Sequence, residues 1–533
     1  MASDRELAAR EARRLEVQAA LDSRKSALER NRLGQFATPP TLATEIARFA
    51  RTLLRGRLRN LDFADPAVGS GAFFSAACRV FTSKKLSSST GVELDPAFAA
   101  TARELWEDFG LHVLEGDFTD PATLEGSVAR PNLILTNPPY VRHHHISSEQ
   151  KTRLQARLVR ELGVQASGLA GLYVYFLLLA TAWMSDDGLA IWLIPSEFMD
   201  VNYGEVLRRF LAERVSLVRI HRFDPNEVQF DDALVSSAIV VFRKKPPAPG
   251  TSAQFTFGGS LAKPHLEEEI QLRRLADEGK WTRFPRSGGD RAELSASGLL
   301  LGDLFKIQRG LATGANRVFI LSREEAVRHG LPERFLRPIL PSPRHLSGTV
   351  VEAEEDGYPK LDRQFCLIDC DLPELQVREK YPLLWSYLQD AEKQGARDRY
   401  LSQKRSPWYR QERRAPAPFL CTYMGRGAED ARPFRFIWNC SDATATNLYL
   451  LLYPVGHLAG ALERDPQLLA KLFEMLCRIT GQNLRQAGRV YGGGLHKIEP
   501  RELAQVAVGS LLRDLGLEEQ VTAPTLFGQA ATS

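Results

Sequence analysis

The chain has 533 residues, of which 44% are hydrophobic and 25% charged, and 69 Lys and Arg against 65 Asp and Glu give a formal net charge of +4. This length predicts two or three domains with sizeable cores. The small net charge excludes a chain that is basic throughout, so any nucleic-acid contact must come from local clusters of Lys and Arg.

The cysteines exclude two further classes of protein. Six of them, at positions 78, 366, 370, 421, 440 and 477, form neither a secreted disulfide framework nor a paired zinc motif. No secretory signal or long apolar span stands in the sequence. We therefore expect reduced thiols, no metal site, no membrane association and a cytoplasmic location.

The first 32 residues are rich in Ala, Arg, Glu and Leu, which predicts an exposed helical extension. After it, residues 61–73 have the pattern of a strand that ends in a loop of small residues before a helix. Gly69 and Gly71 in this loop allow a backbone to approach a ligand closely. The loop lacks Gly-x-Gly-x-x-Gly and the Lys-Ser/Thr pair of a P-loop, which disfavours a pyrophosphate ligand.

Two further predicted strands end in acidic residues. Residues 89–95 contain Glu93, which is placed to bind ribose hydroxyls in a doubly wound sheet. Residues 111–115 lead into Asp117 and Phe118, an acceptor for an adenine amino group and an aromatic ring for its face. One such acid is more often a helix cap than a ligand, but the strand ends taken together favour a nucleoside-containing ligand.

Residues 132–140 have the pattern of a short apolar strand that ends in Asn137, Pro138, Pro139 and Tyr140. An exocyclic amine on an aromatic base is a poor nucleophile until acceptors hold its two hydrogens. The Asn137 side chain and the Pro138 carbonyl offer two acceptors, the prolines stiffen the turn, and Tyr140 offers a flat face for stacking. The alternative interpretation is an ordinary turn.

Together these segments resemble the class I S-adenosylmethionine-dependent methyltransferases. The specific resemblance is to the TaqI-like, gamma-class N6-adenine DNA methyltransferases of restriction-modification or related defence systems, in which a segment similar to residues 34–40 precedes the glycine loop. The resemblance implies a doubly wound, mostly parallel, seven-stranded α/β sheet with an antiparallel C-terminal hairpin strand. It also implies S-adenosyl-L-methionine as cofactor, bound by Thr38, Asp65, Ala67, Gly69, Gly71, Glu93, Asp117, Phe118 and Pro139.

The resemblance extends to the reaction. It implies that Asn137, Pro138 and Tyr140 act on a flipped-out adenine, with Phe230 as a second stacking aromatic ahead of the predicted strand 235–242. Flipping costs a few kcal/mol, and aromatic stacking returns roughly 1 to 3 kcal/mol per base. The alternative role for Phe230 is to cover the end of a hairpin. His143, His144 and His145 are either a metal cluster or a loop. Adjacent histidines point in divergent directions and no cysteine or carboxylate spacing accompanies them, so we expect a mobile loop that faces DNA.

A run of Lys, Pro, Gly, Ser and Thr after residue 245 marks a domain boundary or an exposed connection. We expect a helical extension over 1–32, a catalytic domain over 33–245, a linker over 246–262, a mixed α+β target-recognition domain over 263–520 and a tail over 521–533. Arg208-Arg209, Lys404-Arg405 and Arg413-Arg414 are either DNA contacts or solvated surface. Expected partners are duplex DNA and a separate restriction endonuclease or defence subunit, with a monomer favoured.

Other functions stay open from the sequence. An N4-cytosine methyltransferase uses the same geometry, although Asn rather than Ser at position 137 favours adenine. RNA is another candidate substrate, and a protein glutamine methyltransferase carries the same tetrapeptide without so long a C-terminal part. A catalytically dead specificity module is the alternative outside enzymes, and the intact cofactor positions argue against it.

Overall fold

The computed structural model describes residues 4–55, 60–81, 86–126, 129–224, 236–285, 299–426, 433–491 and 495–518. The chain divides into two compact units, Met1–Arg291 and Ala292–Ser533. Each unit has its own sheets and its own hydrophobic clusters.

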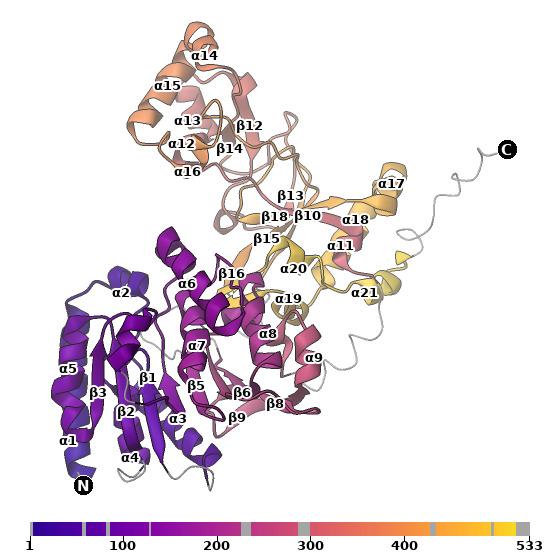
Figure 1. The fold of residues 1–533 in the computed structure, drawn as a ribbon. Helices are drawn as coiled ribbons and strands as arrows, with labels where there is room; N and C mark the ends of the chain where they lie inside the picture. The colour runs from indigo at the N-terminus through magenta and orange to yellow at the C-terminus, as the bar shows by residue number, and fades with distance from the viewer. Residues whose placement is uncertain are drawn as a thin grey trace. The chain divides into compact units, whose positions relative to one another are not determined.

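A single mixed sheet forms the centre of the first unit (Figure 1). Over the described residues its strands are β1 (Leu61–Asp65), β2 (Leu86–Glu93), β3 (Leu111–Glu115), β4 (Leu133–Thr136), β5 (Leu189–Pro195), β6 (Ser216–Arg222), β7 (Ser237–Arg243), β8 (Ser252–Gly259) and β9 (Pro264–Gln271). Their order is β3-β2-β1-β4-β5-β7-β6-β8-β9. The first five strands in this order are parallel, and β7 runs antiparallel to both of its neighbours. The carboxyl ends of β1, β2, β3 and β4 therefore lie along one edge of the sheet.

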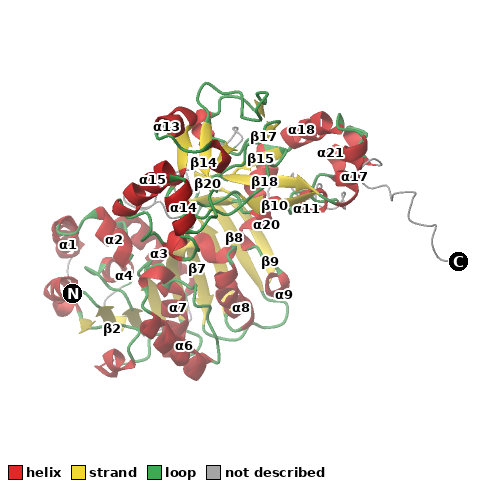
Figure 2. Cartoon of the chain, turned by 90° about the horizontal axis from the view of Figure 1, so that it is seen from above, coloured by secondary structure: helices red, strands yellow, loops and turns green. Residues whose placement is uncertain are grey.

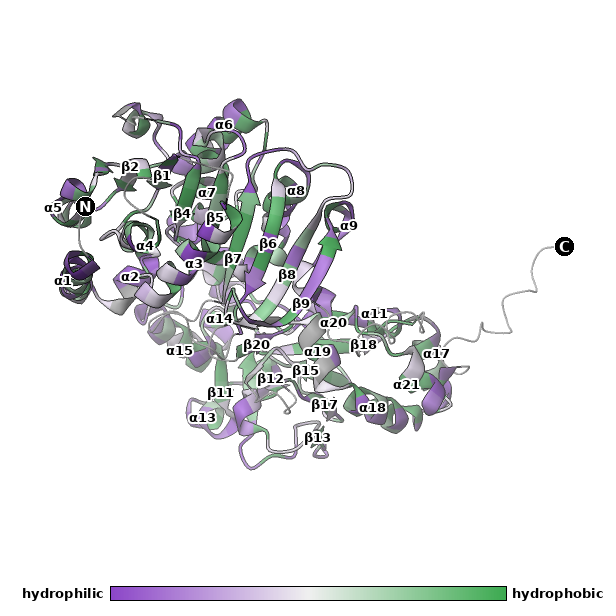
Figure 3. Cartoon of the chain, turned by 90° about the horizontal axis from the view of Figure 1, so that it is seen from below, coloured by the Kyte–Doolittle hydropathy of each residue, from purple (hydrophilic) through white to green (hydrophobic). Residues whose placement is uncertain are grey.

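Helices cover both faces of this sheet (Figure 2). One face carries α1 (Asp4–Ser23), α3 (Pro40–Leu53), α4 (Ala72–Val80) and α5 (Pro96–Trp106), and the other carries α6 (Ser148–Leu162), α7 (Leu172–Trp183), α8 (Glu205–Glu213) and α9 (Leu272–Asp277). The side chains of Leu133 and Leu135 in β4 pack in the hydrophobic cluster on the side of α3, α4 and α5. Ile134, between them, packs in the cluster on the side of α6, α7 and α8. Because successive strand residues point to opposite faces, an uninterrupted apolar run such as β4 is the pattern of a strand buried on both sides. The hydrophobic colouring of β7 in Figure 3 reflects the same burial.

The expected doubly wound, mostly parallel α/β fold with an antiparallel hairpin strand is confirmed. The sheet, however, has nine strands over the described residues rather than seven. Part of the expected linker, 246–262, is β8, and residues after 263 form β9 and α9 of the same unit. The reason is burial: Phe255 of β8 contacts Trp281 and Phe284, and all three side chains are almost inaccessible to solvent. The division between units falls at Arg291, not near residue 245.

The second unit is mixed α+β. Over its described residues one sheet has the order β10 (Phe305–Arg309), β18 (Tyr449–Pro454), β15 (Phe419–Thr422), β17 (Phe436–Asn439) and β13 (Val350–Val351), a second has β11 (Ile320–Ser322), β14 (Phe365–Ile368) and β12 (Leu336–Ile339), and a third has β16 (Met424–Arg426), β20 (Leu495–Lys497) and β19 (Arg489–Tyr491). Its longer helices are α13 (Arg323–Arg328), α14 (Glu374–Lys380), α15 (Pro382–Lys393), α17 (Gly456–Arg464), α18 (Leu468–Arg478), α19 (Gly481–Ala487) and α21 (Gly509–Asp514).

Across both units, none of the helices in the described part of the chain is long and apolar enough to cross a bilayer.

Candidate active site

Asn137, the first residue after β4, uses only half of its side-chain amide within the protein. Its Nδ2 donates to the Phe36 carbonyl at 3.0 Å and to Thr38 Oγ1 at 3.1 Å. Its Oδ1 is buried and accepts no hydrogen bond from the described residues. An unpaired buried acceptor costs about 1 to 3 kcal/mol. The amide is thus held with its oxygen unpaired among the described residues, where it can accept from an external donor.

Residues 34–38, which follow α2 (Ala27–Leu33), lie directly against the tetrapeptide. The Tyr140 amide donates to the Gly34 carbonyl at 3.0 Å. Gly34 has a φ of +64°, and a Cβ at this position would lie 2.3 Å from the Tyr140 nitrogen. Only glycine fits this approach, because any side chain would overlap the partner backbone. Thr38 and Asn137, 99 positions apart in the chain, are therefore brought into contact.

Tyr140 is buried and held at both ends of its side chain. Its hydroxyl donates to the Leu193 carbonyl at 3.1 Å, and its ring centre lies 5.5 Å from that of Phe36. Burial raises the pKa of the phenol, so it is neutral at physiological pH. Between Asn137 and Tyr140, Pro138 is buried and its carbonyl receives no hydrogen bond from the described residues. The loop thus carries two acceptor oxygens that receive no donor from the part of the chain that the structure describes.

The glycine loop begins where β1 ends, at Asp65. Asp65 Oδ1 accepts from Thr136 Oγ1 at 2.6 Å and from the Ala67 amide at 3.0 Å. Burial raises the pKa of this carboxyl to about 7, against the opposing effect of those two donors. Gly69 and Gly71 have φ values of +54° and +92°. A Cβ on Gly71 would lie 2.5 Å from Trp106 Nε1, so close packing as well as conformation requires glycine there.

Glu93, at the end of β2, faces the same loop. Its Oε2 accepts from the Gly69 amide at 2.9 Å, and its Oε1 accepts from the Asp95 amide at 2.9 Å. Burial raises the pKa of the Glu93 carboxyl. Asp95 itself caps α5, accepting from the Ala97 amide at 3.0 Å. Asp95 is therefore a helix cap, whereas Glu93 links the end of β2 to the glycine loop.

Asp117 and Phe118 follow β3, the next strand along the edge. Asp117 Oδ1 accepts from the amide and the hydroxyl of Thr119 at 2.8 and 2.7 Å, and its Oδ2 lies 3.5 Å from Arg153. Phe118 is 2% exposed, with its ring centre 5.1 Å from that of Phe176. Contacts join the predicted residues Thr38 to Asn137, Asp65 to Ala67 and Glu93 to Gly69. Asp117 and Phe118 follow the neighbouring parallel strand, and Pro138, Pro139 and Tyr140 follow Asn137 after β4. Phe230 lies outside the described residues.

The tandem histidines and Arg208 lie in different structural surroundings. His143–His145 form a short 3-10 helix after the tetrapeptide, and no group of His, Cys, Asp or Glu in the described part of the chain is arranged to hold a metal ion. Arg208 is buried and donates to the Phe198 and Val201 carbonyls, so it is a structural residue.

Two residues of the site were not predicted. Thr136 holds Asp65, and its only sequence signal is a hydroxyl at the end of an apolar strand. Ser70, between the two loop glycines, receives hydrogen bonds from Arg14 of α1 and from Trp106 of α5. Sequence spacing gives no sign of either contact, because the partners are far apart in the chain.

Two protein families match parts of the chain. Residues 128–229, which include the tetrapeptide, match the family described as Eco57I restriction-modification methylase. Residues 291–523 match the family described as Type II methyltransferase M.Eco57I, C-terminal domain. The second match begins where the two compact units divide.

Individual relatives match over nearly the whole chain. Type II methyltransferase M.XamI of Xanthomonas campestris pv. amaranthicola is 30% identical over 496 residues, which cover 90% of this chain and 86% of the relative. Type II methyltransferase M.AccI of Acinetobacter calcoaceticus is 25% identical over 520 residues, or 93% and 88% of the two chains.

Among solved structures, the type IIL restriction-modification enzyme MmeI in complex with DNA has a similar fold. The alignment has a TM-score of 0.56 at 14% sequence identity and covers 84% of this chain. This chain spans 66% of that one. Because the sequence identity is so low, the likeness concerns the fold alone.

Proposed function

This chain belongs to the type II DNA methyltransferases of restriction-modification systems, and from that membership we propose that it methylates the exocyclic N6 of an adenine turned out of duplex DNA. The observation that carries the proposal is that Oδ1 of Asn137 and the carbonyl of Pro138 accept no hydrogen bond from any described residue. Two fixed acceptors suit an amino group, which has two hydrogens to donate.

The amino nitrogen of a base attacks poorly because its lone pair is delocalised into the ring. When Asn137 Oδ1 and the Pro138 carbonyl accept its two hydrogens, the nitrogen pyramidalises and the lone pair becomes available. Both acceptors also stabilise the positive charge that grows on nitrogen during attack, so no strong base is required beforehand. Because Nδ2 of Asn137 is tied to Phe36 and Thr38, the acceptor needs no reorganisation.

The residues along the sheet edge suit S-adenosyl-L-methionine, which would supply an electrophilic methyl group on its sulfonium. The N–C bond would form as the S–C bond breaks, leaving the neutral thioether S-adenosyl-L-homocysteine, and the methylated amine would then lose one proton to solvent. Asp65 is buried and Glu93 is half-buried beside a loop of small residues, where acidic side chains would hold the amino acid and ribose parts of such a cofactor. Thr38, Asp117, Phe118 and Pro139 complete the proposed binding set. The loop carries neither of the pyrophosphate-binding glycine patterns.

The base itself would stack on Tyr140, with Phe230 as the proposed second aromatic. The remaining parts of the proposal concern partners: the second unit would read the DNA sequence, and a separate restriction endonuclease would cleave the unmethylated site. The similarity of residues 291–523 to a family of C-terminal methyltransferase domains supports the assignment of the second unit.

The decisive experiment replaces Asn137 by Ala. Loss of a preorganised group that acts in the transition state typically lowers kcat by roughly 10²- to 10³-fold, and we expect a loss of at least this size. Calorimetry should show nearly unchanged affinity for S-adenosyl-L-methionine. The matched control is Asn132→Ala. Asn132 immediately precedes the same strand, but both ends of its amide are paired, with the Asp62 amide at 3.0 Å and the Asn60 carbonyl at 3.1 Å.

Asn132→Ala should lower stability and leave the methylation rate per folded molecule intact. An Asn137→Ala enzyme that methylates DNA normally would refute the catalytic role. Digestion of the modified DNA to deoxynucleosides then identifies the base: N6-methyl-2′-deoxyadenosine supports the proposal, whereas N4-methyl-2′-deoxycytidine would assign the same geometry to cytosine.

A further inference from the structure

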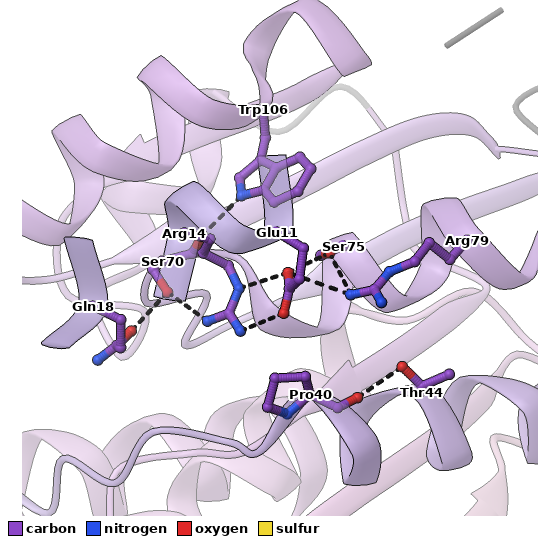
Figure 4. Close-up of polar contacts among 9 residues, drawn as sticks. All are labelled: Glu11, Arg14, Gln18, Pro40, Thr44, Ser70, Ser75, Arg79 and Trp106. Carbon is purple, nitrogen blue, oxygen red and sulfur yellow. Dashed lines mark hydrogen bonds and ion pairs between the residues drawn. The ribbon is translucent and has the colours of Figure 1, made fainter. Parts of the chain in front are cut away.

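The N-terminal helix α1 carries a buried ion pair that points toward the glycine loop (Figure 4). Arg14 and Glu11 form a two-pronged contact, with Nε to Oε2 at 2.9 Å and Nη2 to Oε1 at 2.7 Å. The Arg14 side chain is 1% exposed and that of Glu11 is 8% exposed. A helix that merely covers a surface does not require a buried charge pair, because apolar side chains of similar volume stabilise as well or better.

The third nitrogen of Arg14 reaches the middle of the glycine loop. Arg14 Nη1 donates to Ser70 Oγ at 3.0 Å, and Ser70 Oγ donates to Gln18 Oε1 at 2.6 Å. From the other side, Trp106 Nε1 of α5 donates to the Ser70 carbonyl at 2.9 Å. Ser70 is thus held by α1 through its side chain and by α5 through its backbone.

Glu11 is the residue that orients Arg14. Ser75 Oγ donates to Glu11 Oε2 at 2.6 Å, and Arg79 Nη2 lies 3.4 Å from the same oxygen. Burial raises the pKa of the Glu11 carboxyl, but the hydrogen bond and charge of Arg14, together with Ser75 and Arg79, bring it below its ordinary value. Glu11 is therefore ionised at neutral pH, and its charge fixes the plane of the guanidinium.

The same extension makes a second contact at the sheet edge. Lys25 stands between α1 and α2, and its Nζ donates to Asp95 Oδ2 at 2.6 Å and to Gln35 Oε1 at 3.0 Å. The Asp95 amide in turn donates to Glu93. The N-terminal extension therefore contacts the glycine loop through Ser70, and it contacts Asp95, whose amide donates to Glu93.

We propose that α1 is part of the cofactor site, with Arg14 as a positioning residue that holds Ser70 and thereby sets the conformation of the loop between Gly69 and Gly71. Arg14 acts through Ser70 and does not touch the cofactor. This inference rests on the proposed function, because it assigns that loop to S-adenosyl-L-methionine.

The test measures cofactor affinity by calorimetry on the full chain, with Ser70→Ala, Arg14→Gln and the double variant. Loss of a hydrogen bond to a charged group changes a binding equilibrium by roughly tenfold or more when the bond maintains the bound geometry. We expect each single variant to raise the Kd for S-adenosyl-L-methionine about tenfold and to raise its KM with kcat unchanged. Because the two residues act through one contact, the double variant should be little weaker than either single variant.

The matched control is Arg10→Gln. Arg10 lies one turn earlier on α1 and also binds α5, donating to the Leu105 carbonyl at 2.8 Å and pairing with Asp108, but it does not touch the loop. Its loss should lower the melting temperature and leave the Kd unchanged. Ser70→Ala keeps the Arg14–Glu11 pair, so the test stands even where Arg14→Gln fails to fold.

The outcomes separate the two proposals. If the wild type binds the cofactor and Ser70→Ala binds it equally well, the positioning role is refuted and the proposed function is untouched. The positioning role is also refuted if the losses of affinity in Ser70→Ala and Arg14→Gln add up in the double variant. It is refuted as well if Arg10→Gln binds the cofactor as weakly as Arg14→Gln does. If the wild type binds no S-adenosyl-L-methionine, the proposed function fails and this inference fails with it.

Discussion

Asn137 uses the two ends of one amide differently. The nitrogen donates to the protein, and the oxygen has no donor among the residues that the structure describes. Such an arrangement is costly for folding, because a buried acceptor without a partner loses its hydration. The cost is consistent with the proposed role, since the same desolvation strengthens the hydrogen bond to a substrate amine.

The ionisation of Asp65 should make the stability of the protein depend on pH. Its pKa is raised by burial to about 7, from an ordinary value of 3.8. The native protein then binds the proton more tightly than the unfolded chain does. Protonated Asp65 therefore contributes stability that is fully present below about pH 4 and is lost as the pH rises through about 7.

We expect the unfolding free energy of the wild type, relative to Asp65→Asn, to decline between these two pH values by at most about 1.4 kcal/mol per pH unit. Above pH 8 the difference should be constant. Urea unfolding of both proteins across this range measures it. A difference that does not change with pH would show that Asp65 ionises normally.

At the scale of elements, the close approach of the segment after α2 to the loop after β4 assembles the site. Gly34 ends α2 in the left-handed conformation, and its carbonyl accepts from Tyr140. Gly163 ends α6 with the same φ of +64°, but an added Cβ there would meet nothing within 4 Å. The two glycines share this backbone conformation and differ in what lies beside them.

Gly163→Ala should therefore cost about 1 kcal/mol of stability, the strain of a left-handed alanine. Gly34→Ala should cost clearly more, because the Cβ would overlap the Tyr140 backbone, and it should also lower the methylation rate by moving Thr38 away from Asn137. Denaturant unfolding and initial rates on both variants check this. Equal losses in the two variants would mean that the Tyr140 contact is unimportant.

At the scale of the whole molecule, the division at Arg291 predicts which fragments fold. A fragment of residues 1–291 keeps all nine described strands of the sheet and should unfold cooperatively. A fragment of residues 1–245 lacks the buried side chains Phe255, Ile270, Leu275, Trp281 and Phe284. Since each such side chain contributes about 1.5 to 3 kcal/mol, this fragment should be much less stable. Thermal melts followed by circular dichroism compare the two, and equal melting temperatures would place the boundary near residue 245 after all.

The sequence by itself determined the strands of the parallel half of the sheet and the tetrapeptide that follows β4, because short apolar runs, loop glycines and an Asn-Pro-Pro turn are local patterns. It also placed Asp65, Glu93, Asp117 and Asn137 at strand ends, and parallel strands bring their carboxyl ends to one edge.

Only the tertiary structure decided which end of the Asn137 amide is free, which acid caps a helix, that α1 reaches Ser70, and that β8 and β9 belong to the first unit. Each of these depends on partners far apart in the chain. Side chains there are selected by packing and burial, and those interactions leave no periodicity in the sequence that spacing alone reveals.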